Sequence, residues 1–126
     1  KVNVPGGETV VEGGVDPVKG LYGGTDDADN SGSLQYVRIE YAGIPFQPDQ
    51  EINGLTLGGV GSGTTVEYIQ VHENADDGIE FFGGTVNAKY VVLTSNQDDS
   101  VDWDNGFRGN LQYVLVKHDP ANGQAN

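Results

Sequence analysis

A short acidic segment occurs twice in this chain, and its spacing constrains the fold more than any other feature. Residues 74–84 read NADDGIEFFGG, and residues 96–106 read NQDDSVDWDNG, so the second copy begins 22 residues after the first. Each copy holds an Asn, two adjacent Asp residues, a small residue, a β-branched residue, an acid and an aromatic residue. A period of this length is typical of solenoids, in which each coil stacks on the previous one.

Four other segments share a tyrosine-centred pattern with the period of a β-strand. They are LQYVRIEY (34–41), VEYIQVHE (66–73), AKYVVLTS (88–95) and LQYVLVKH (111–118). Their tyrosines are 32, 22 and 23 residues apart, and PFQPDQE (45–51), with two prolines, reads as an exposed loop inserted in the longest interval. A second strand is expected in each coil, at NGLTLGG (53–59), DGIEFFGG (77–84) and DSVDWDNG (99–106).

Strand alternation assigns side chains to faces, with the tyrosines on one face and aliphatic residues on the other. In the second strands Trp103 occupies the position of Leu57 and Phe81, so we expect it in the core, with Glu80 and Asp102 on the opposite face. Glycine is 20 of 126 residues and only 36% of the chain is hydrophobic, which suits short strands and tight turns better than helices. The sequence predicts an all-β fold, a parallel β-solenoid with coils of about 22 residues.

The phrases YGGTDDADNSGSLQYVRIEYAG, EINGLTLGG and NADDGIEFFGGTVNAKYV carry a family resemblance. They resemble secreted or lipid-anchored bacterial surface proteins with right-handed, pectate-lyase-like parallel β-helix repeats. The resemblance covers residues 2–118 and implies a right-handed β-helix at the cell surface. It implies no catalytic residues, because that family has no well-defined activity.

We expect one solenoid domain over residues 1–126, as a fragment of a longer protein or as an assembling unit. Residues 1–31 would form an N-terminal coil and acidic loop, 32–118 the repeated coils, and 119–126 a tail. The two ends of such a solenoid are rows of unpaired backbone groups, and head-to-tail stacking of copies would cover them.

The repeat stacks acids of like charge. Since stacked strands lie about 4.8 Å apart, the period predicts three pairs: Asp76 with Asp98, Asp77 with Asp99, and Glu80 with Asp102. Residues 73–104 contain eight acids and one basic residue, Lys89. A like-charged pair at about 5 Å costs about 3 kcal/mol at an effective dielectric constant of 20. Calcium bridging would remove this cost, since Ca²⁺ binds six to eight oxygen ligands; a solvated acidic ridge and catalytic carboxylates are the alternatives.

Four smaller features bear on function. The loop DADNSGS (27–33) resembles the first half of a calcium loop and offers Asp27, Asp29 and Ser31, but its twelfth position is an arginine; a flexible acidic loop is the alternative. In the acidic turns, Asn74 over Asn96 predicts an amide ladder. Arg108 is expected to pair with Asp104 or Asp102. The fourth feature is the tyrosine column, either a sugar-binding strip or a structural ladder: Tyr36, Tyr68, Tyr90 and Tyr113.

The formal net charge of −13 argues against binding to nucleic acid or to an anionic membrane surface. The chain has no apolar run long enough for membrane insertion and no cysteine. We therefore expect an extracellular or bacterial cell-surface module with a structural, adhesive or self-assembling role, stabilised by calcium. The alternative is a carbohydrate-active β-helix, a lyase or glycoside hydrolase, that binds or cleaves polysaccharide through carboxylates at the acidic turns.

Overall fold

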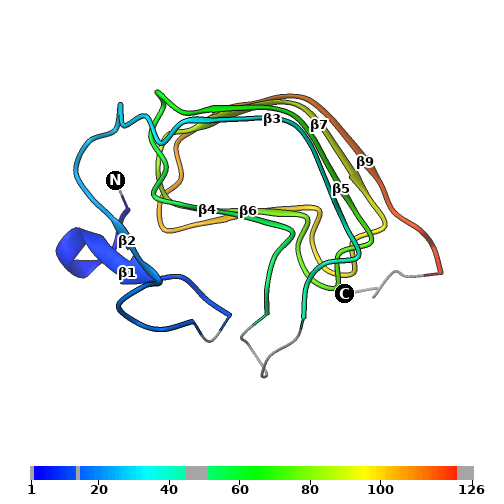
Figure 1. Ribbon diagram of the computed structural model, residues 1–126, viewed down its shortest axis with the longest axis horizontal. Helices are drawn as coiled ribbons and strands as arrows, with labels where there is room; N and C mark the ends of the chain where they lie inside the picture. The colour runs from blue at the N-terminus through cyan, green and yellow to red at the C-terminus, as the bar shows by residue number, and fades with distance from the viewer. Residues whose placement is uncertain (1, 14, 45–50, 122–126) are drawn as a thin grey trace.

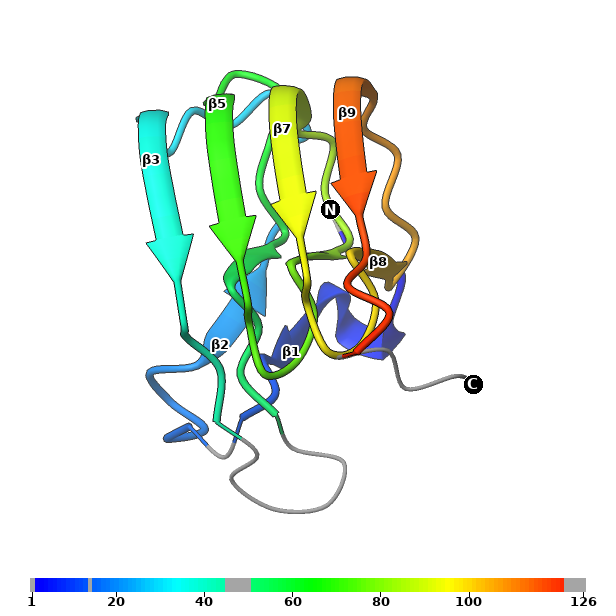
Figure 2. The same cartoon turned by 90° about the vertical axis from the view of Figure 1, so that its right-hand side faces the viewer.

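Seven parallel strands in two sheets wind around a common axis in the computed structural model, which describes residues 2–13, 15–44 and 51–121. One sheet has the order β3-β5-β7-β9 and the other the order β4-β6-β8. Figure 1 views the molecule down the stack, and Figure 2 shows the first sheet with its strands side by side. The strands of the two sheets are β3 (Ser33–Glu40), β4 (Leu55–Gly58), β5 (Thr65–His72), β6 (Ile79–Phe82), β7 (Asn87–Thr94), β8 (Val101–Asp104) and β9 (Leu111–Lys117).

The strand register matches the sequence repeat. Ile69 pairs with Val37 on one side and with Val91 on the other, and Phe81 pairs with Leu57 and with Trp103. The predicted first and second strands of each coil are confirmed within one or two residues at their ends. The predicted loop at 45–51 lies outside the described residues, apart from Glu51.

The tyrosines of the first sheet stand at a bend in each strand that alternation did not predict. Tyr68 has a φ angle of 56°, and the other three tyrosines of the column have φ angles between 56° and 60°. This left-handed conformation shifts the alternation by one residue, so Val66 and Ile69 both point inward while Glu67 and Tyr68 both point outward. A left-handed residue with a Cβ costs about 1–2 kcal/mol, and stacking between the rings, worth about 0.5–1.5 kcal/mol a pair, offsets part of that cost.

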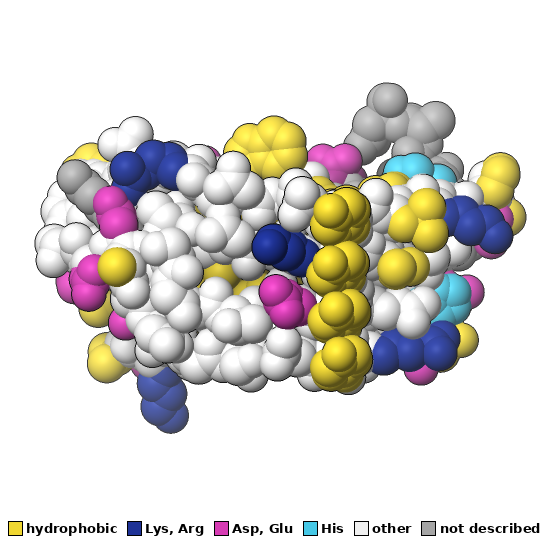
Figure 3. Space-filling model, turned by 90° about the horizontal axis from the view of Figure 1, so that it is seen from above, with side chains coloured by type: hydrophobic (Ala, Val, Ile, Leu, Met, Phe, Trp, Pro, Cys, Tyr) yellow, Lys and Arg dark blue, Asp and Glu magenta, His cyan; other side chains and the backbone are white. Residues whose placement is uncertain are grey.

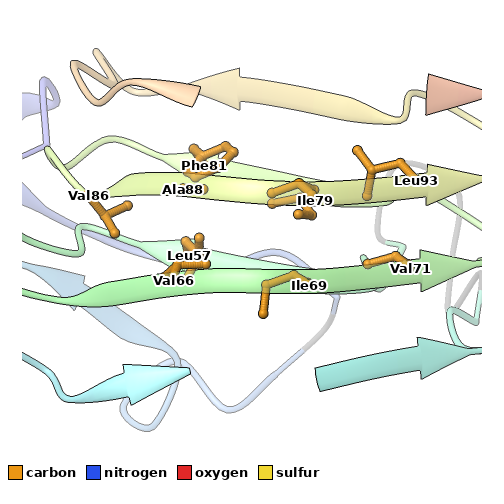
Figure 4. Close-up of a cluster of buried hydrophobic side chains, with 10 residues drawn as sticks. Leu57, Val66, Ile69, Val71, Ile79, Phe81, Val86, Ala88 and Leu93 are labelled. Carbon is orange, nitrogen blue, oxygen red and sulfur yellow. The ribbon is translucent and has the colours of Figure 1, made fainter. Parts of the chain in front are cut away.

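The core lies between the two sheets and is made of aliphatic side chains with one phenylalanine at its centre. Phe81 and Ile79 are fully buried, and the Phe81 ring stacks on Phe107 with centroids 4.4 Å apart. Figure 4 shows these side chains filling the interior of the coils. The buried cluster consists of Leu57, Val66, Ile69, Val71, Ile79, Phe81, Val86, Ala88, Val91 and Leu93.

The prediction that Trp103 belongs to the core is wrong. Its register position is the predicted one, opposite Phe81, but its side chain is 63% exposed. Among the described residues β8 pairs only with β6, so no further strand covers the other side of Trp103. A position in a solenoid column therefore fixes the direction of a side chain but not its burial.

The N-terminal segment packs beside the second sheet and does not pair with its strands (Figure 1). It contains a short 3₁₀ turn, η1 (Pro5–Gly7), and an antiparallel pair of strands, β1 (Glu8–Val10) and β2 (Leu21–Gly23). Asn105 anchors it at two points: its carbonyl accepts a hydrogen bond from the Asn3 backbone, and its side-chain amide donates to the Tyr22 hydroxyl at 2.8 Å. This contact brings the segment alongside the acidic strands.

Candidate functional site

The two acidic repeats meet in the turns that join β5 to β6 and β7 to β8. The backbone N–H of Gly78 donates to the Asp99 carbonyl at 2.9 Å, which holds one turn over the next. Asn74 and Asn96 are buried and stacked as predicted, but the prediction of a ladder of hydrogen bonds between their side-chain amides is wrong. Asn96 Oδ1 instead accepts the backbone N–H of Asn74 at 3.2 Å, and Asn74 Nδ2 donates to the Asp77 carbonyl at 2.7 Å. The asparagines therefore stabilise the turn backbones that carry the aspartates.

The first group of acids lies at these turns and joins three carboxylates. Single oxygen atoms of Asp76, Asp77 and Asp98 lie within 4.8 Å of one another. Asp76 and Asp77 are each only 8% exposed, whereas Asp98 and Asp99 are exposed on the outer coil. In the predicted pair of Asp77 and Asp99, Asp77 Oδ1 accepts the backbone N–H of Asp99 at 2.9 Å, so this contact joins a carboxylate to a backbone rather than two carboxylates.

A second group continues from the first along the outward face of β6 and β8. Oxygen atoms of Asp77, Glu80 and Asp102 also lie within 4.8 Å of one another, so Asp77 belongs to both groups. Glu80 and Asp102 are register partners, as the repeat predicts. Glu80 is 5% exposed because the N-terminal segment covers this face of the sheet, and no such cover was predicted.

Burial and mutual repulsion raise the pKa of three of these carboxyl groups. Burial, opposed by a backbone hydrogen bond from Asp77, raises the pKa of Asp76 to about 6. Burial and then the charge of Asp76 raise the pKa of Asp77 to about 7. For Glu80, burial and then the hydrogen bond and charge of Glu12 raise the pKa to about 9. At neutral pH the metal-free site therefore retains protons that a bound cation would displace.

Two residues of the site were missed in the sequence, Glu12 and Asn53. The Asn53 amide donates through Nδ2 to Glu12 Oε1 at 2.8 Å and to Glu80 Oε2 at 2.5 Å. Alignment of NGLTLGG with DGIEFFGG could have found Asn53, because Leu55 pairs with Ile79 and Asn53 thus precedes its strand as Asp77 precedes β6. Glu12 lies outside the repeats, so no spacing in the sequence indicates it.

The donor set of these two groups fits a hard cation. All the converging side-chain ligands are oxygen atoms, which calcium prefers, and in each group they lie within 4.8 Å of one another, close enough for one ion to contact several of them. Among the described residues, Asn53 Oδ1, Asn74 Oδ1 and Ser100 Oγ are buried near these turns without a hydrogen-bond partner. An unsatisfied buried polar atom costs about 1–3 kcal/mol, so the corner has oxygen atoms to offer a cation or water.

The upstream loop has a different environment. Asp27 Oδ2 forms an ion pair with Arg108 at 2.8 Å, and this hydrogen bond holds the pKa of Asp27 below its usual range. The expected pairing of Arg108 with Asp104 or Asp102 is therefore wrong. Ser31 Oγ donates to Asp29 Oδ2 at 2.7 Å. The loop does not contribute to either group of converging acids among the described residues, and a calcium site at Asp27, Asp29 and Ser31 stays a prediction.

The tyrosine column forms a stack on the outer face of the first sheet. Ring centroids are 4.6 Å apart for Tyr36 and Tyr68, 4.6 Å for Tyr68 and Tyr90, and 5.0 Å for Tyr90 and Tyr113. Figure 3 shows hydrophobic side chains gathered in a column across this face, with acidic and basic side chains beside it. Because the rings are within 12° of parallel, the inner rings cover one another's faces and present mainly their edges to solvent.

A shallow apolar groove of about 480 Å³ runs beside the column. Three of its lining residues are tyrosines, and Val91, Val114 and Leu115 are among the others. Leu115 is 58% exposed, so the groove presents apolar surface to solvent. The structure thus places the tyrosine strip and the acidic turns in different parts of the coil.

Comparison with known proteins gives one match. A family model described as a pectate-lyase-like beta helix domain matches residues 3–126. No curated protein matches, and no solved structure matches. None of the described residues forms a helix long and apolar enough to cross a membrane.

Proposed function

The chain belongs to the pectate-lyase-like beta helix domain family, and from this premise we propose that it is a calcium-stabilised structural module. In this proposal the parallel coils, right-handed as the resemblance implies, form an extracellular or cell-surface scaffold with an adhesive or self-assembling role. The strong negative charge supports a partner that is a cation or a neutral or cationic polymer.

One observation carries the proposal: the convergence of Asp76, Asp77 and Asp98 at stacked turns. Two of these carboxyl groups are buried, and their pKa values are raised to about 6 and about 7 in the metal-free protein. Ca²⁺ would replace repulsion and retained protons with direct coordination. The ion would bridge consecutive turns, so its binding energy would add to the stability of the coils.

Thermal unfolding with and without calcium tests the proposal. The protein is freed of metal with EDTA and melted in 1 mM CaCl₂, in 1 mM MgCl₂ and without added cation. A calcium concentration one hundred times Kd stabilises the folded state by about 2.7 kcal/mol, which corresponds to a rise in Tm of roughly 10 °C for a domain of this size. Magnesium should do less, because it requires a regular octahedral site and dehydrates reluctantly.

Variants locate the effect. Asp98→Asn should lose most of the calcium-dependent rise in Tm. Asp16→Asn is the matched control, because it removes the same charge from an exposed turn. The Asp16 side chain accepts hydrogen bonds from the Val18 and Lys19 N–H groups, and the oxygen of an asparagine amide can accept the same bonds. An equal calcium response in Asp98→Asn and the wild type would contradict a site at these turns.

Head-to-tail association is the form of self-assembly that we propose. Among the described residues β3 and β9 each pair on one side only, and a second copy that continued the register would set β9 against β3. Tyr113 would then stack on Tyr36 of the next copy, and Lys117 would face Glu40, since the existing column runs from Glu40 to Lys117. Val114, Leu115 and Val116 on β9 are exposed apolar residues that such a contact would cover.

Sedimentation velocity at micromolar protein with millimolar calcium tests this association. We expect species larger than the monomer for the wild type, fewer for Lys117→Glu, and no change for Lys19→Glu, which makes the same charge change in an exposed N-terminal turn. A monomer at every concentration would contradict the association while leaving the calcium proposal intact.

Polysaccharide binding is a second candidate, and the apolar groove beside the tyrosines favours it. Sugar rings stack on exposed aromatic faces, and Tyr113, with one ring neighbour and 62% exposure, offers more face than Tyr68 or Tyr90. Cleavage would also need carboxylates open to a sugar chain, whereas Asp76, Asp77 and Glu80 are buried. Affinity electrophoresis in gels containing neutral or acidic polysaccharide tests the binding, which Tyr113→Ala should weaken.

A further inference from the structure

The dipeptide Asn-Gly occurs three times in the chain, and one copy stands in an exposed turn. The copies are at 53–54, 105–106 and 122–123, and the last lies outside the described residues. Asparagine before glycine is prone to spontaneous deamidation, because glycine has no side chain to hinder attack by its backbone nitrogen on the asparagine amide. The two described copies therefore offer the same chemistry in different surroundings.

The copy at Asn53 is held closed by its surroundings. Asn53 is 5% exposed, and its amide nitrogen donates to both Glu12 and Glu80. The attacking group, the Gly54 N–H, donates to the Asp77 carbonyl of the next coil at 2.9 Å. Reaction at Asn53 therefore requires local opening of the coils.

The copy at Asn105 is open at the corresponding atoms. Gly106 is exposed, and its N–H has no hydrogen-bond acceptor among the described residues. Asn105 is half-buried, and its amide nitrogen, the leaving group, donates to the Tyr22 hydroxyl at 2.8 Å. Rotation of the peptide into position for attack breaks two hydrogen bonds, the one that closes the turn at 3.2 Å and the one from the Asn3 N–H to the Asn105 carbonyl. No further coil is stacked on this turn in the described part of the chain.

The fold does not require asparagine at this position. Asn105 follows β8 as Gly59 follows β4 and Gly83 follows β6, and the φ angles are 50°, 63° and 69° respectively. Glycine adopts this left-handed conformation freely, whereas asparagine is only tolerated there. The feature that asparagine adds is the side-chain bond to Tyr22, one of the two bonds by which residue 105 anchors the N-terminal segment.

We propose that Asn105 deamidates spontaneously and that its isoaspartate product releases the N-terminal segment from the coils. The Gly106 nitrogen bonds to the side-chain carbonyl carbon of Asn105, its proton and the amide NH₂ leave together as ammonia, and a cyclic succinimide remains. Water then opens the ring at either carbonyl to give aspartate or isoaspartate. One water is consumed and one ammonia is released, and the step needs no oxidant or reductant.

The products disturb both hydrogen bonds of the anchor. A carboxylate cannot donate to the Tyr22 hydroxyl, and it adds a negative charge beside Asp104, whose side chain accepts the Asn105 backbone N–H at 2.5 Å. Isoaspartate also lengthens the backbone by one carbon, which displaces the carbonyl that accepts the Asn3 N–H at 2.7 Å. The N-terminal segment then loses its attachment to residue 105.

Peptide mapping by mass spectrometry tests the modification. The protein is incubated in mildly alkaline buffer, both folded and in guanidinium chloride, and digested with trypsin, which places the three Asn-Gly pairs on separate peptides, 39–89, 90–108 and 118–126. In the folded protein Asn105 should deamidate at least about tenfold faster than Asn53, which reacts only in locally opened molecules. In guanidinium chloride the two rates should be similar. Equal rates in the folded protein, or an Asn105 that reacts only when unfolded, would overturn the proposal.

Hydrogen–deuterium exchange tests the release of the segment. Peptides that contain Asn3 should exchange faster in the wild type after incubation than before it. Asn105→Gly is the matched control, because glycine stands at the equivalent position of the other two coils and cannot deamidate, so its exchange should not change on incubation. Deamidation of Asn105 without faster exchange at Asn3 would overturn the release.

Discussion

Replacing Asp77 with Asn should stabilise the metal-free protein at high pH and leave its stability nearly unchanged at low pH. The carboxyl group of Asp77 is 8% exposed and its pKa is raised from 3.8 to about 7 by burial and by Asp76. An asparagine has nearly the same shape, and its Oδ1 can still accept the Asp99 N–H that Asp77 accepts at 2.9 Å. The substitution therefore isolates the cost of the buried charge.

The size of the effect follows from the shift in pKa. The folded pKa is above the unfolded one, so the folded protein binds the proton more tightly, and wild-type stability falls as the pH rises from about 4 to about 7. A shift of about 3 units at 1.36 kcal/mol each gives an upper limit of about 4 kcal/mol at pH 8. Because Asp76 shares the repulsion and can relax when Asp77 is neutral, we expect a gain of about 2 kcal/mol.

Urea denaturation in EDTA at pH 4 and pH 8 measures this gain. Asp77→Asn should exceed the wild type in unfolding free energy at pH 8 and match it at pH 4. In calcium at pH 8 the order should reverse, since the variant lacks a ligand. Asp99→Asn, at the equivalent exposed position one coil further, should differ from the wild type by less than about 0.5 kcal/mol. Equal destabilisation of Asp77→Asn at both pH values would refute the reasoning, because it would show a structural rather than an electrostatic role.

Further predictions concern the packing of the coils. Phe81→Ala should cost about 3–5 kcal/mol because the ring is fully buried, whereas Trp103→Ala, at the paired but exposed position, should cost less than about 1 kcal/mol; equal costs in urea denaturation would contradict the open outer coil. Tyr68→Leu loses two ring contacts and should cost about 1–3 kcal/mol, twice the cost of Tyr113→Leu, which loses one. A cost for Tyr113→Leu as large as that for Tyr68→Leu would show that the rings do not stabilise the column by stacking. Metal-free wild-type protein should lose stability steadily between pH 4 and pH 7 in the same assay, and a rise over that interval would contradict the raised pKa values of Asp76 and Asp77.

The repeat predicted the strands and their register because stacking in a solenoid is dictated by local period. Ile69 and Val71 were assigned to one face by strand alternation, and both are buried in the structure. The 22-residue spacing likewise predicted that Asp77 and Asp99 stack on each other. The hydrogen bond from the Asp99 N–H to the Asp77 carboxylate shows that they are neighbours in adjacent coils. What repeats along the chain was therefore readable from the sequence.

Features that do not repeat along the chain could not be predicted from the sequence. Glu12 reaches the acidic cluster only through the docking of the N-terminal hairpin, a contact between segments with no common period. The same hairpin buries Glu80, which alternation placed on an outward face. The predicted burial of Trp103 is wrong for a different reason. Its place in the column gave the correct direction of the side chain, but no strand pairs with β8 on its outer side among the described residues. Arg108 pairs with Asp27, which is 81 positions away in the sequence, and the spacing within a repeat does not predict a contact between such distant residues.

A crystal structure of the protein grown in calcium, with an anomalous difference map, tests the central claim most directly. The claim predicts a peak bounded by oxygen atoms of Asp76, Asp77 and Asp98, with ligand distances of about 2.3–2.6 Å. A map with no peak at these turns, in crystals that contain millimolar calcium and with the three carboxyl groups contacting only water or one another, would contradict it.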